Sequence, residues 1–294
     1  MRILLLGKNG QIGWELHRAL APLGAVTALG AGEFDLANLD GLRGVVRAAK
    51  PDVIVNAAAH TAVDPAEKES ELAHTLNARA PEAIAEEARR LGALMVHYST
   101  DYVFDGRKQT AYVEDDPVNP LNVYGHSKVA GEHAIAASGC RYLVLRTSWV
   151  YSARGTNFFL TIRRLAGELN ELRVVDDQHG VPNWSRTLGE ATAAILATGL
   201  RREWPTGTYH LSSRGTTNWH GFAQAIVEEL RIDKPVVPVR TDEFPRPAKR
   251  PPNGTLDSGK LERDLGIVLP DWRQVLELCV ADFLEGRAGR QVKA

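Results

Sequence analysis

Cysteine is almost absent from this chain of 294 residues, which contains only Cys140 and Cys279. Two cysteines so far apart form neither a disulfide framework nor the paired spacing of a zinc site. No histidine has the H-E-x-x-H spacing of a metal site either, so the sequence assigns no metal ligand. The scarcity of cysteine is typical of a reducing, intracellular compartment, and we expect a cytoplasmic protein.

Excess charge of either sign is also missing, because 35 basic residues stand against 36 acidic ones. This balance gives no indication of a nucleic-acid or membrane partner. No stretch approaches the roughly 20 apolar residues of a membrane-spanning helix, and the N-terminal apolar run 3–6 is too short for a signal peptide. The G-x-S-x-G and P-loop motifs of hydrolases and kinases do not occur.

Short apolar runs alternate with helical patterns in the first half of the chain. The sequence predicts strands at 3–6, 25–29, 52–55, 93–98 and 142–145, and helices at 11–20, 66–91 and 122–137. This alternation predicts an α/β fold with a Rossmann-like, doubly wound parallel sheet. Ligands of such sheets bind beyond the carboxyl ends of the strands, where segments 7–13, 56–59 and 99–101 fall.

The pattern loosens after about residue 150, where prolines punctuate short elements. We expect residues 1–170 to form a dinucleotide-binding Rossmann domain whose sheet is completed in part by later residues. Residues 171–294 would form mainly a smaller substrate-binding lobe. This lobe would be discontinuous in sequence, and its boundary is soft.

Three glycines follow the first predicted strand. Gly7 would allow a tight turn, Gly10 would let a pyrophosphate approach the backbone, and Gly13 would let the helix pack closely on the strand. The helix N-terminus would then face the phosphates. The spacing G-x-x-G-x-x-G differs from the usual G-x-G-x-x-G, but its place between strand and helix favours a nicotinamide dinucleotide.

The end of the second strand leaves the choice between NADH and NADPH open. It carries neither the acidic residue that binds a ribose 2′-hydroxyl nor the arginine that suits a 2′-phosphate. Leu29-Gly30 stands there instead, so nothing repels the phosphate of NADPH. Asp35-Leu36 follows and could lie along the adenine, or Asp35 could cap a helix that begins near Asn38.

Tyr124 and Lys128 are four residues apart in a predicted helix, so their side chains would lie side by side. A neighbouring ammonium favours phenolate and would lower the pKa of Tyr124, which makes it a better acid–base group. Just past a strand, the hydroxyl of Ser99 or Thr100 could bond a substrate oxygen, or the segment could be a simple turn. Together with the glycine loop, these residues predict carbonyl reduction.

These residues stand in longer segments that resemble one known family. The segments are 7–16, 51–64, 97–104, 120–125, 146–151 and, more weakly, 177–182, 215–220 and 250–251. They are similar to the dTDP-4-dehydrorhamnose reductase family of the extended short-chain dehydrogenase/reductase superfamily. The resemblance covers essentially the whole chain. It implies NAD(P)H-dependent reduction of the C4 ketone of dTDP-4-dehydro-β-L-rhamnose, a dTDP-linked 4-keto-6-deoxy sugar, to dTDP-β-L-rhamnose.

The resemblance also implies roles for individual residues. Tyr124 would donate the proton, Lys128 would hold the nicotinamide ribose and tune Tyr124, and Thr100, chosen over Ser99, would assist. The expected cofactor-binding residues are Gly7, Gly10, Gln11, Ile12, Gly13, Asp35, Leu36, Ala59, His60, Thr61, Tyr98, Tyr124 and Lys128. The expected sugar contacts are Thr100, Asp101 and Trp149.

The sequence departs from the family at two positions. Asn183 replaces a common threonine after a proline, and Gly30 stands where some members have aspartate. Some members hold magnesium at a carboxylate-rich dimer contact, so magnesium and a homodimer are expectations without assigned residues. The substrate diphosphate needs cations, for which Arg246, Lys249 and Arg250 are candidates unless they form a solvated loop.

Two other functions fit the same motifs. One is an epimerase or dehydratase of the same fold, which recycles its cofactor. The other is a non-catalytic regulatory subunit that binds NADP. An intact set of Thr100, Tyr124 and Lys128 argues against the second function, and net consumption of the cofactor separates the first from a reductase.

Overall fold

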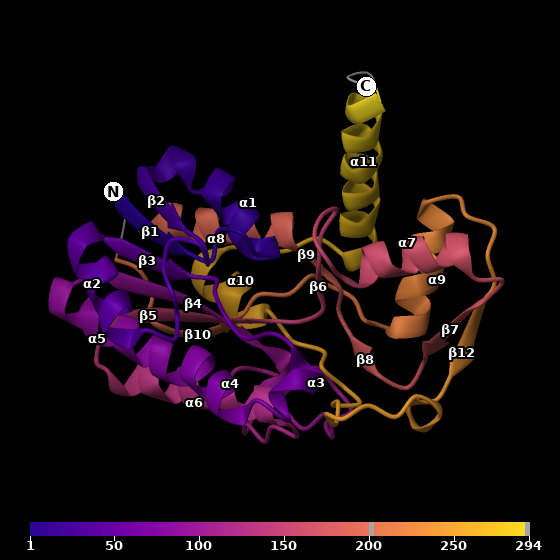
Figure 1. The fold of residues 1–294 in the computed structure, drawn as a ribbon, viewed down its shortest axis with the longest axis horizontal. Coiled ribbons are helices and arrows are strands. Elements are labelled where there is room, and N and C mark those ends of the chain that lie inside the picture. Colours follow the sequence, from indigo (N-terminus) through magenta and orange to yellow (C-terminus); the bar gives the residue numbers. More distant parts are fainter. Residues whose placement is uncertain (200–202, 292–294) are drawn as a thin grey trace.

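A central sheet of six parallel strands dominates the computed structural model, which describes residues 1–199 and 203–291. The strand order is β10-β5-β4-β3-β1-β2 (Figure 1). The strands are β1 (Arg2–Leu6), β2 (Ala25–Leu29), β3 (Val53–Asn56), β4 (Leu94–Thr100), β5 (Arg141–Thr147) and β10 (Gly207–His210). The order reverses between β1 and β3, so a crevice for ligands is expected at their carboxyl ends.

Helices cover both faces of the sheet (Figure 1). On one face lie α1 (Gln11–Ala19) and α8 (Ser185–Thr198); on the other lie α2 (Leu39–Ala49), α5 (Ala80–Leu91) and α6 (Val123–Ala137). Both faces of strand β1 are buried, which explains its run of apolar residues. Ile3 and Leu5 enter one core while Leu4 and Leu6 enter the other, since successive side chains of a strand point to opposite faces.

A smaller lobe packs beside the carboxyl ends of the sheet (Figure 1). Its strand pairs are β7 (Leu172–Val175) with β12 (Val236–Val239), β6 (Val150–Tyr151) with β9 (Asn183–Trp184), and β8 (His179–Gly180) with β11 (Thr217–Asn218). Its helices are α7 (Phe158–Glu168), α9 (Trp219–Glu229) and α11 (Trp272–Gln291). Aromatic side chains such as Phe159 and Phe222 fill a core separate from those of the sheet.

The chain passes from the sheet to the lobe and back again. Strand β10 pairs with β5 at the edge of the sheet, although it follows β7 and β9 in sequence. After α9 and β12 in the lobe, α10 (Gly259–Leu265) packs against β10. The division of the chain at residue 170 stays a prediction. Within the described ranges, no helix has the length and apolar character needed to cross a membrane.

The predicted helix at 66–91 is interrupted at residues 67–69 and changes to π-helical geometry at 75–79, but it is helical from 70 to 91. The chain forms α3 (Val63–Ala66), α4 (Ser70–His74) and a π-helical turn (Thr75–Arg79) before α5. The π-helical turn contains the buried side chain of Asn77, which bonds the backbone of His60 on both its N–H and C=O and the hydroxyl of Ser127. A regular α-helix would turn this amide elsewhere. Short 3₁₀ turns occur at Ala21–Leu23, Asp101–Val103 and Thr241–Glu243.

Candidate active site

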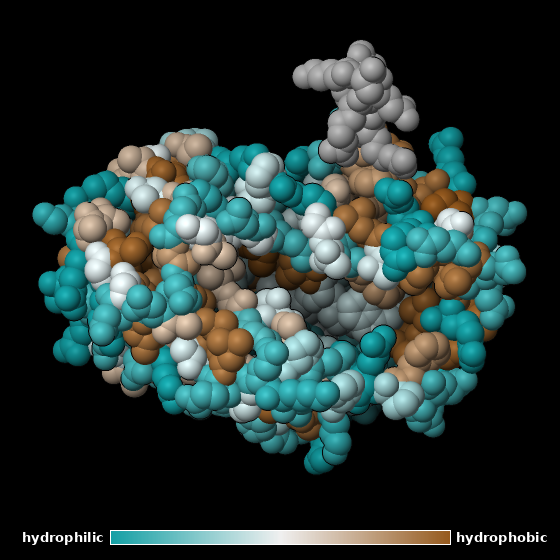
Figure 2. Space-filling view, viewed as in Figure 1, coloured by the Kyte–Doolittle hydropathy of each residue, from teal (hydrophilic) through white to brown (hydrophobic). Residues whose placement is uncertain are grey.

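A cleft of about 930 Å³ lies at the carboxyl ends of the strands, between the sheet and the lobe. Figure 2 shows the surface hollowed between these two parts. The predicted site residues that line the cleft are Gly7, Gly10, Gln11, Ile12, Asp35, Leu36, Ala59, Thr61, Tyr98, Thr100, Asp101, Tyr124, Lys128 and Trp149. Gly13 and His60 lie behind the lining. The three residues proposed for catalysis therefore meet in the same cleft as the glycine loop.

The glycine loop has the shape that a dinucleotide pyrophosphate requires. Gly7 has a positive φ of 92°, and a Cβ at Gly13 would stand 2.0 Å from the carbonyl oxygen of Gly7. A Cβ at Gly10 would meet only that same oxygen, at 3.4 Å, so the surface of the loop is open there. No side chain caps the N-terminus of α1, which leaves its first amides for a phosphate. These residues fit a nicotinamide dinucleotide.

A carboxylate that sequence reasoning missed lies at the end of β2. Glu33 accepts a hydrogen bond from the backbone N–H of Gly30 at 2.7 Å and forms an ion pair with Lys8 at 2.5 Å. Position 30 has no acidic side chain, but the carboxylate of Glu33 lies beside it, and Lys8 offsets the charge of that carboxylate. Asn38 caps α2 by accepting from Gly41, so Asp35 is free of that role and lines the cleft.

Lys128 is fully enclosed beneath the cleft floor and makes two contacts. Its Nζ donates to the carbonyl oxygen of Tyr98 at 2.6 Å and lies 3.0 Å from Nε2 of His97. Burial lowers the pKa of Lys128 to about 8, against the opposing attraction of Glu132. Burial and the charge of Lys128 hold the pKa of His97 well below its usual value, so this ring is neutral.

The expected lowering of the Tyr124 pKa by Lys128 is wrong for this structure. Burial raises the pKa of Tyr124 to about 12, and a hydrogen bond with Thr100 only partly offsets that rise. Lys128 does not lower the pKa of Tyr124; its Nζ bonds the carbonyl oxygen of Tyr98 and lies beside His97. Tyr124 therefore keeps its proton at neutral pH, as a proton donor must.

The choice between the two hydroxyls of the Ser99-Thr100 pair follows from their partners. Ser99 donates to the Oε1 of Glu132 at 2.5 Å, and Glu132 forms a buried ion pair with Arg146 at 2.7 Å. The hydroxyl proton of Ser99 is therefore used in this buried contact with Glu132. Both residues line the cleft, but only Thr100 bonds Tyr124, which agrees with the role the resemblance assigns to it.

Asp101 is buried in the cleft wall beside Thr100. Its Oδ1 accepts from the Thr100 hydroxyl at 3.1 Å, while its Oδ2 has no hydrogen-bond partner and is shielded by Gly254. Burial raises the pKa of Asp101 to about 7. Asp101 also lines the cleft, so its carboxyl group stands beside Thr100 where a polar ligand would bind.

Trp149 lies opposite these residues with a positive φ of 42°, which is unusual for a residue other than glycine. Its indole stacks on Trp219 of α9, with ring centroids 3.7 Å apart and planes at 10°. Both rings line the cleft. Trp219 lies in the segment 215–220, which resembles the family only weakly, and the sequence analysis assigned no role to its side chain.

The proposed diphosphate cations do not reach the cleft. Arg250 forms an ion pair with Asp64 at 3.0 Å and donates to the carbonyl of Ala248. Arg246, Lys249 and Arg250 are all outside the cleft lining. The structure therefore does not bring these cations to the predicted site. The loop 155–157 also lines the cleft, and the amide of Asn157 donates to Gln11 at 3.0 Å.

A family model described as the RmlD substrate binding domain matches residues 1–285. A dTDP-4-dehydrorhamnose reductase of Burkholderia thailandensis is 47% identical over 296 residues, which cover 97% of this chain and 99% of that protein. The chain belongs to the dTDP-4-dehydrorhamnose reductase family.

Solved structures of this family have the same fold. A dTDP-4-dehydrorhamnose reductase from Clostridium acetobutylicum matches with a TM-score of 0.91 and 36% identity, over 97% of this chain and 100% of that one. The reductase from Bacillus anthracis in complex with NADP matches with a TM-score of 0.89 and 34% identity, over 96% and 99%. The predicted Rossmann-like sheet is confirmed.

Asn183, a departure from the family pattern, has a structural role. Its Nδ2 donates to the carbonyl oxygens of Ser148 and Val181, and its Oδ1 accepts from the N–H of Ser213 at 2.7 Å. These bonds join β9 to the chain beyond the ends of β5 and β10. Asn183 is fully buried and does not line the cleft.

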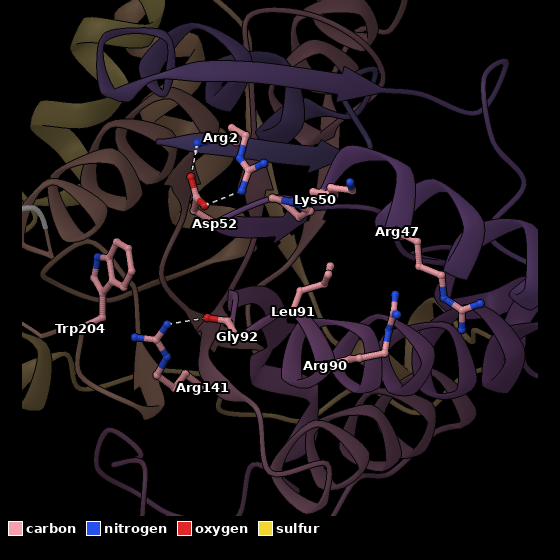
Figure 3. A pocket seen from close by; sticks show the side chains of 10 residues that line it. Arg2, Arg47, Lys50, Asp52, Arg90, Leu91, Gly92, Arg141 and Trp204 are labelled. Atoms are coloured by element: carbon pink, nitrogen blue, oxygen red, sulfur yellow. Dashed lines mark hydrogen bonds and ion pairs between the residues drawn. The ribbon is translucent and has the colours of Figure 1, made fainter.

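A second hollow, of about 650 Å³, lies at the amino ends of the strands (Figure 3). Its basic side chains are Arg2, Arg47, Lys50, Arg90 and Arg141. Arg47 and Arg90 occupy the last turns of α2 and α5, where cations offset the negative ends of the helix dipoles, and both pair with Glu87. Helix stabilisation accounts for much of this basic surface.

Metal binding has no assigned residues. Among the residues that the structure describes, no group of three or more His, Cys, Asp or Glu side chains is arranged to hold a metal ion. Magnesium and a homodimer stay expectations from the resemblance.

Proposed function

We propose that this family member reduces the C4 ketone of dTDP-4-dehydro-β-L-rhamnose to the alcohol of dTDP-β-L-rhamnose, with NADPH or NADH. The observation that carries the proposal is the meeting of Thr100, Tyr124 and Lys128 beside the glycine loop in one cleft. The relatives' names and the NADP complex of one of them support it.

Each residue has a defined task in this reaction. A bound nicotinamide supplies the hydride. Tyr124 holds its proton at neutral pH and donates it to the ketone oxygen as negative charge grows there. The Thr100 hydroxyl, which donates to Asp101 in this structure, would turn toward the same oxygen when the sugar binds, and such donors typically contribute a few kcal/mol each. Trp149 and Asp101 would contact the sugar.

Both nicotinamide cofactors fit the end of β2. Glu33 and Lys8 lie outside the residues that line the cleft and pair with each other, so neither a free carboxylate nor a free cation selects between a 2′-hydroxyl and a 2′-phosphate there. We therefore propose that NADPH and NADH both serve. The two cysteines carry free thiols, which supports a reducing cytoplasmic location.

In the decisive experiment, the purified protein is incubated with dTDP-4-dehydro-β-L-rhamnose and reduced cofactor, and oxidation of the cofactor is followed by its absorbance. We expect stoichiometric oxidation of NADPH and of NADH, with dTDP-rhamnose identified by NMR. Isomerised or dehydrated sugar nucleotide without net oxidation of the cofactor would indicate the epimerase or dehydratase. Cofactor binding without any conversion of the sugar nucleotide would indicate a regulatory subunit.

A further inference from the structure

Gly30, which follows β2, leaves a space that another side chain fills. A Cβ at Gly30 would stand 1.6 Å from Oδ1 of Asn9 and 2.8 Å from its Cγ. Gly30 is buried, whereas Asn9 is exposed and lines the cleft. In a dinucleotide-binding sheet, a carboxylate at the end of the second strand usually bonds the ribose 2′-hydroxyl. The amide of Asn9 therefore occupies the place where the side chain of such an acidic residue would begin.

Asn9 stands between two parts of the cleft that suit the two ends of an adenosine diphosphate. Gly10, the next residue, opens the glycine loop to a pyrophosphate beside the uncapped first amides of α1. Phe34 and Leu36, in the segment after Gly30, line the cleft with apolar side chains that suit an adenine ring. The ribose joins these two groups of the cofactor, which leaves its place beside Asn9.

The side-chain amide of Asn9 is free to bind a ligand, since no residue that the structure describes forms a hydrogen bond with it. The charged side chains nearby are engaged. Lys8 and Glu33 pair with each other outside the cleft lining. Asp35 does line the cleft, and its Oδ1 accepts from the N–H of Ala37 at 2.9 Å.

A carboxamide can bond either form of the cofactor. Its oxygen accepts from a ribose 2′-hydroxyl, and its nitrogen donates to a 2′-hydroxyl or to an oxygen of a 2′-phosphate. This holds whichever end of the amide faces the ligand, because the two ends exchange by rotation of the terminal torsion. A carboxylate in the same place would repel the phosphate, and an arginine would favour it.

We propose that Asn9 replaces the missing acidic residue of β2 as the group that bonds the 2′ substituent of the adenosine ribose. Its uncharged amide is what lets the cleft take both NADPH and NADH. The proposal rests on the proposed function, because it assigns a residue to the cofactor of that reaction. It concerns binding alone, so its test needs no sugar nucleotide.

The test measures the dissociation constants of NADPH and NADH for the full-length protein by fluorescence titration. Asn9→Asp places a carboxylate against the 2′-phosphate, so we expect the ratio of the NADPH constant to the NADH constant to rise about tenfold or more. Asn9→Ala loses one hydrogen bond to either cofactor. Both constants should then rise about three- to tenfold, with little change in their ratio.

Asn38→Asp is the matched control for the added charge. Asn38 lies outside the cleft lining and caps α2 by accepting from Gly41, a role that aspartate also fills. Solvent and salt screen the new charge, so the ratio should stay within about twofold of the wild-type value.

A double variant tests the exchange of roles between the two positions. Gly30→Asp combined with Asn9→Ala puts a carboxylate after β2, in the space that the amide leaves. This variant should bind NADH more tightly than Asn9→Ala alone and NADPH more weakly.

An unchanged ratio in Asn9→Asp would overturn the proposal, as would wild-type constants for both cofactors in Asn9→Ala. A larger shift of the ratio in Asp35→Asn than in Asn9→Asp would also overturn it, because Asp35 would then be the residue at the 2′ position. Expected binding shifts in a protein that does not reduce the sugar nucleotide would contradict the proposed function and support the role of Asn9.

Discussion

The indole of Trp149 lies flat against the indole of Trp219, with centroids 3.7 Å apart. Trp149 follows β5 of the sheet, whereas Trp219 begins α9 of the lobe. The stack therefore joins the two sides of the cleft, and the sugar ring proposed to pack on Trp149 would be positioned by both tryptophans.

Trp219→Leu tests this role. We expect the KM for the sugar nucleotide to rise roughly tenfold, because about 1–1.5 kcal/mol of aromatic packing is lost. Affinity for NADPH should be unchanged, as measured by fluorescence titration. Trp204→Leu, a half-buried tryptophan outside the cleft, is the control. Equal KM values in Trp219→Leu and wild type would remove Trp219 from substrate binding.

Tyr124→Phe removes the proposed proton donor while keeping the ring. We expect kcat to fall roughly 10²–10⁴-fold, with NADPH affinity nearly intact, because general acid catalysis is lost without loss of packing. Steady-state assays and calorimetry measure the two quantities. Tyr142→Phe, on β5 and outside the cleft, should keep full activity. Undiminished turnover in Tyr124→Phe would require another proton donor.

Gly13→Ala and Gly10→Ala separate packing from cofactor binding. The methyl group at Gly13 would stand 2.0 Å from the carbonyl oxygen of Gly7, so we expect a loss of roughly 1–3 kcal/mol in the free energy of unfolding. The methyl group at Gly10 has space, so stability should hold while NADPH affinity falls. Urea denaturation and cofactor titration distinguish the two. Equal stability of the two variants would contradict this reading of the loop.

Asp101→Asn should change the pH dependence of stability. The pKa of Asp101 is raised from 3.8 to about 7, so the folded state binds a proton that the unfolded state releases between these values. This contribution to stability is fully present below about pH 4 and is lost as pH rises through about 7. Relative to Asp101→Asn, the wild type should therefore lose stability over this range in urea denaturation. Parallel curves for the two proteins would show that Asp101 ionises normally.

Sequence reasoning reached the parts of the site that are local in the chain. The glycine loop between β1 and α1 and the pair Tyr124 and Lys128 on α6 are each predicted from local spacing. The rule that ligands bind at the carboxyl ends of parallel strands predicts that the two motifs share one site. The partners of these residues were out of reach. Asn77 bonds the hydroxyl of Ser127, which lies 50 residues away in sequence, and the ring of His97 contacts the amide of Asn56, which lies 41 residues away.

Two other features were missed because they depend on how loops and lobes fold back onto the sheet. Glu33 reaches the end of β2 only because its loop folds back onto Gly30. Trp219 meets Trp149 only after the lobe has formed. Burial also outweighed charge at Tyr124, since the pKa depends on how deeply the helix packs, which periodicity does not measure.

The return of β10 to the sheet decides how this protein can be divided. A fragment that stops at residue 170 would lack both β10 and α8. It would leave β5 as an open strand edge and expose the apolar surface of α1 that α8 covers, so aggregation is expected. Exchange of the lobe between relatives must therefore graft three segments separately, namely those between β6 and β9 and between β11 and β12 together with α11, with β10 kept in place.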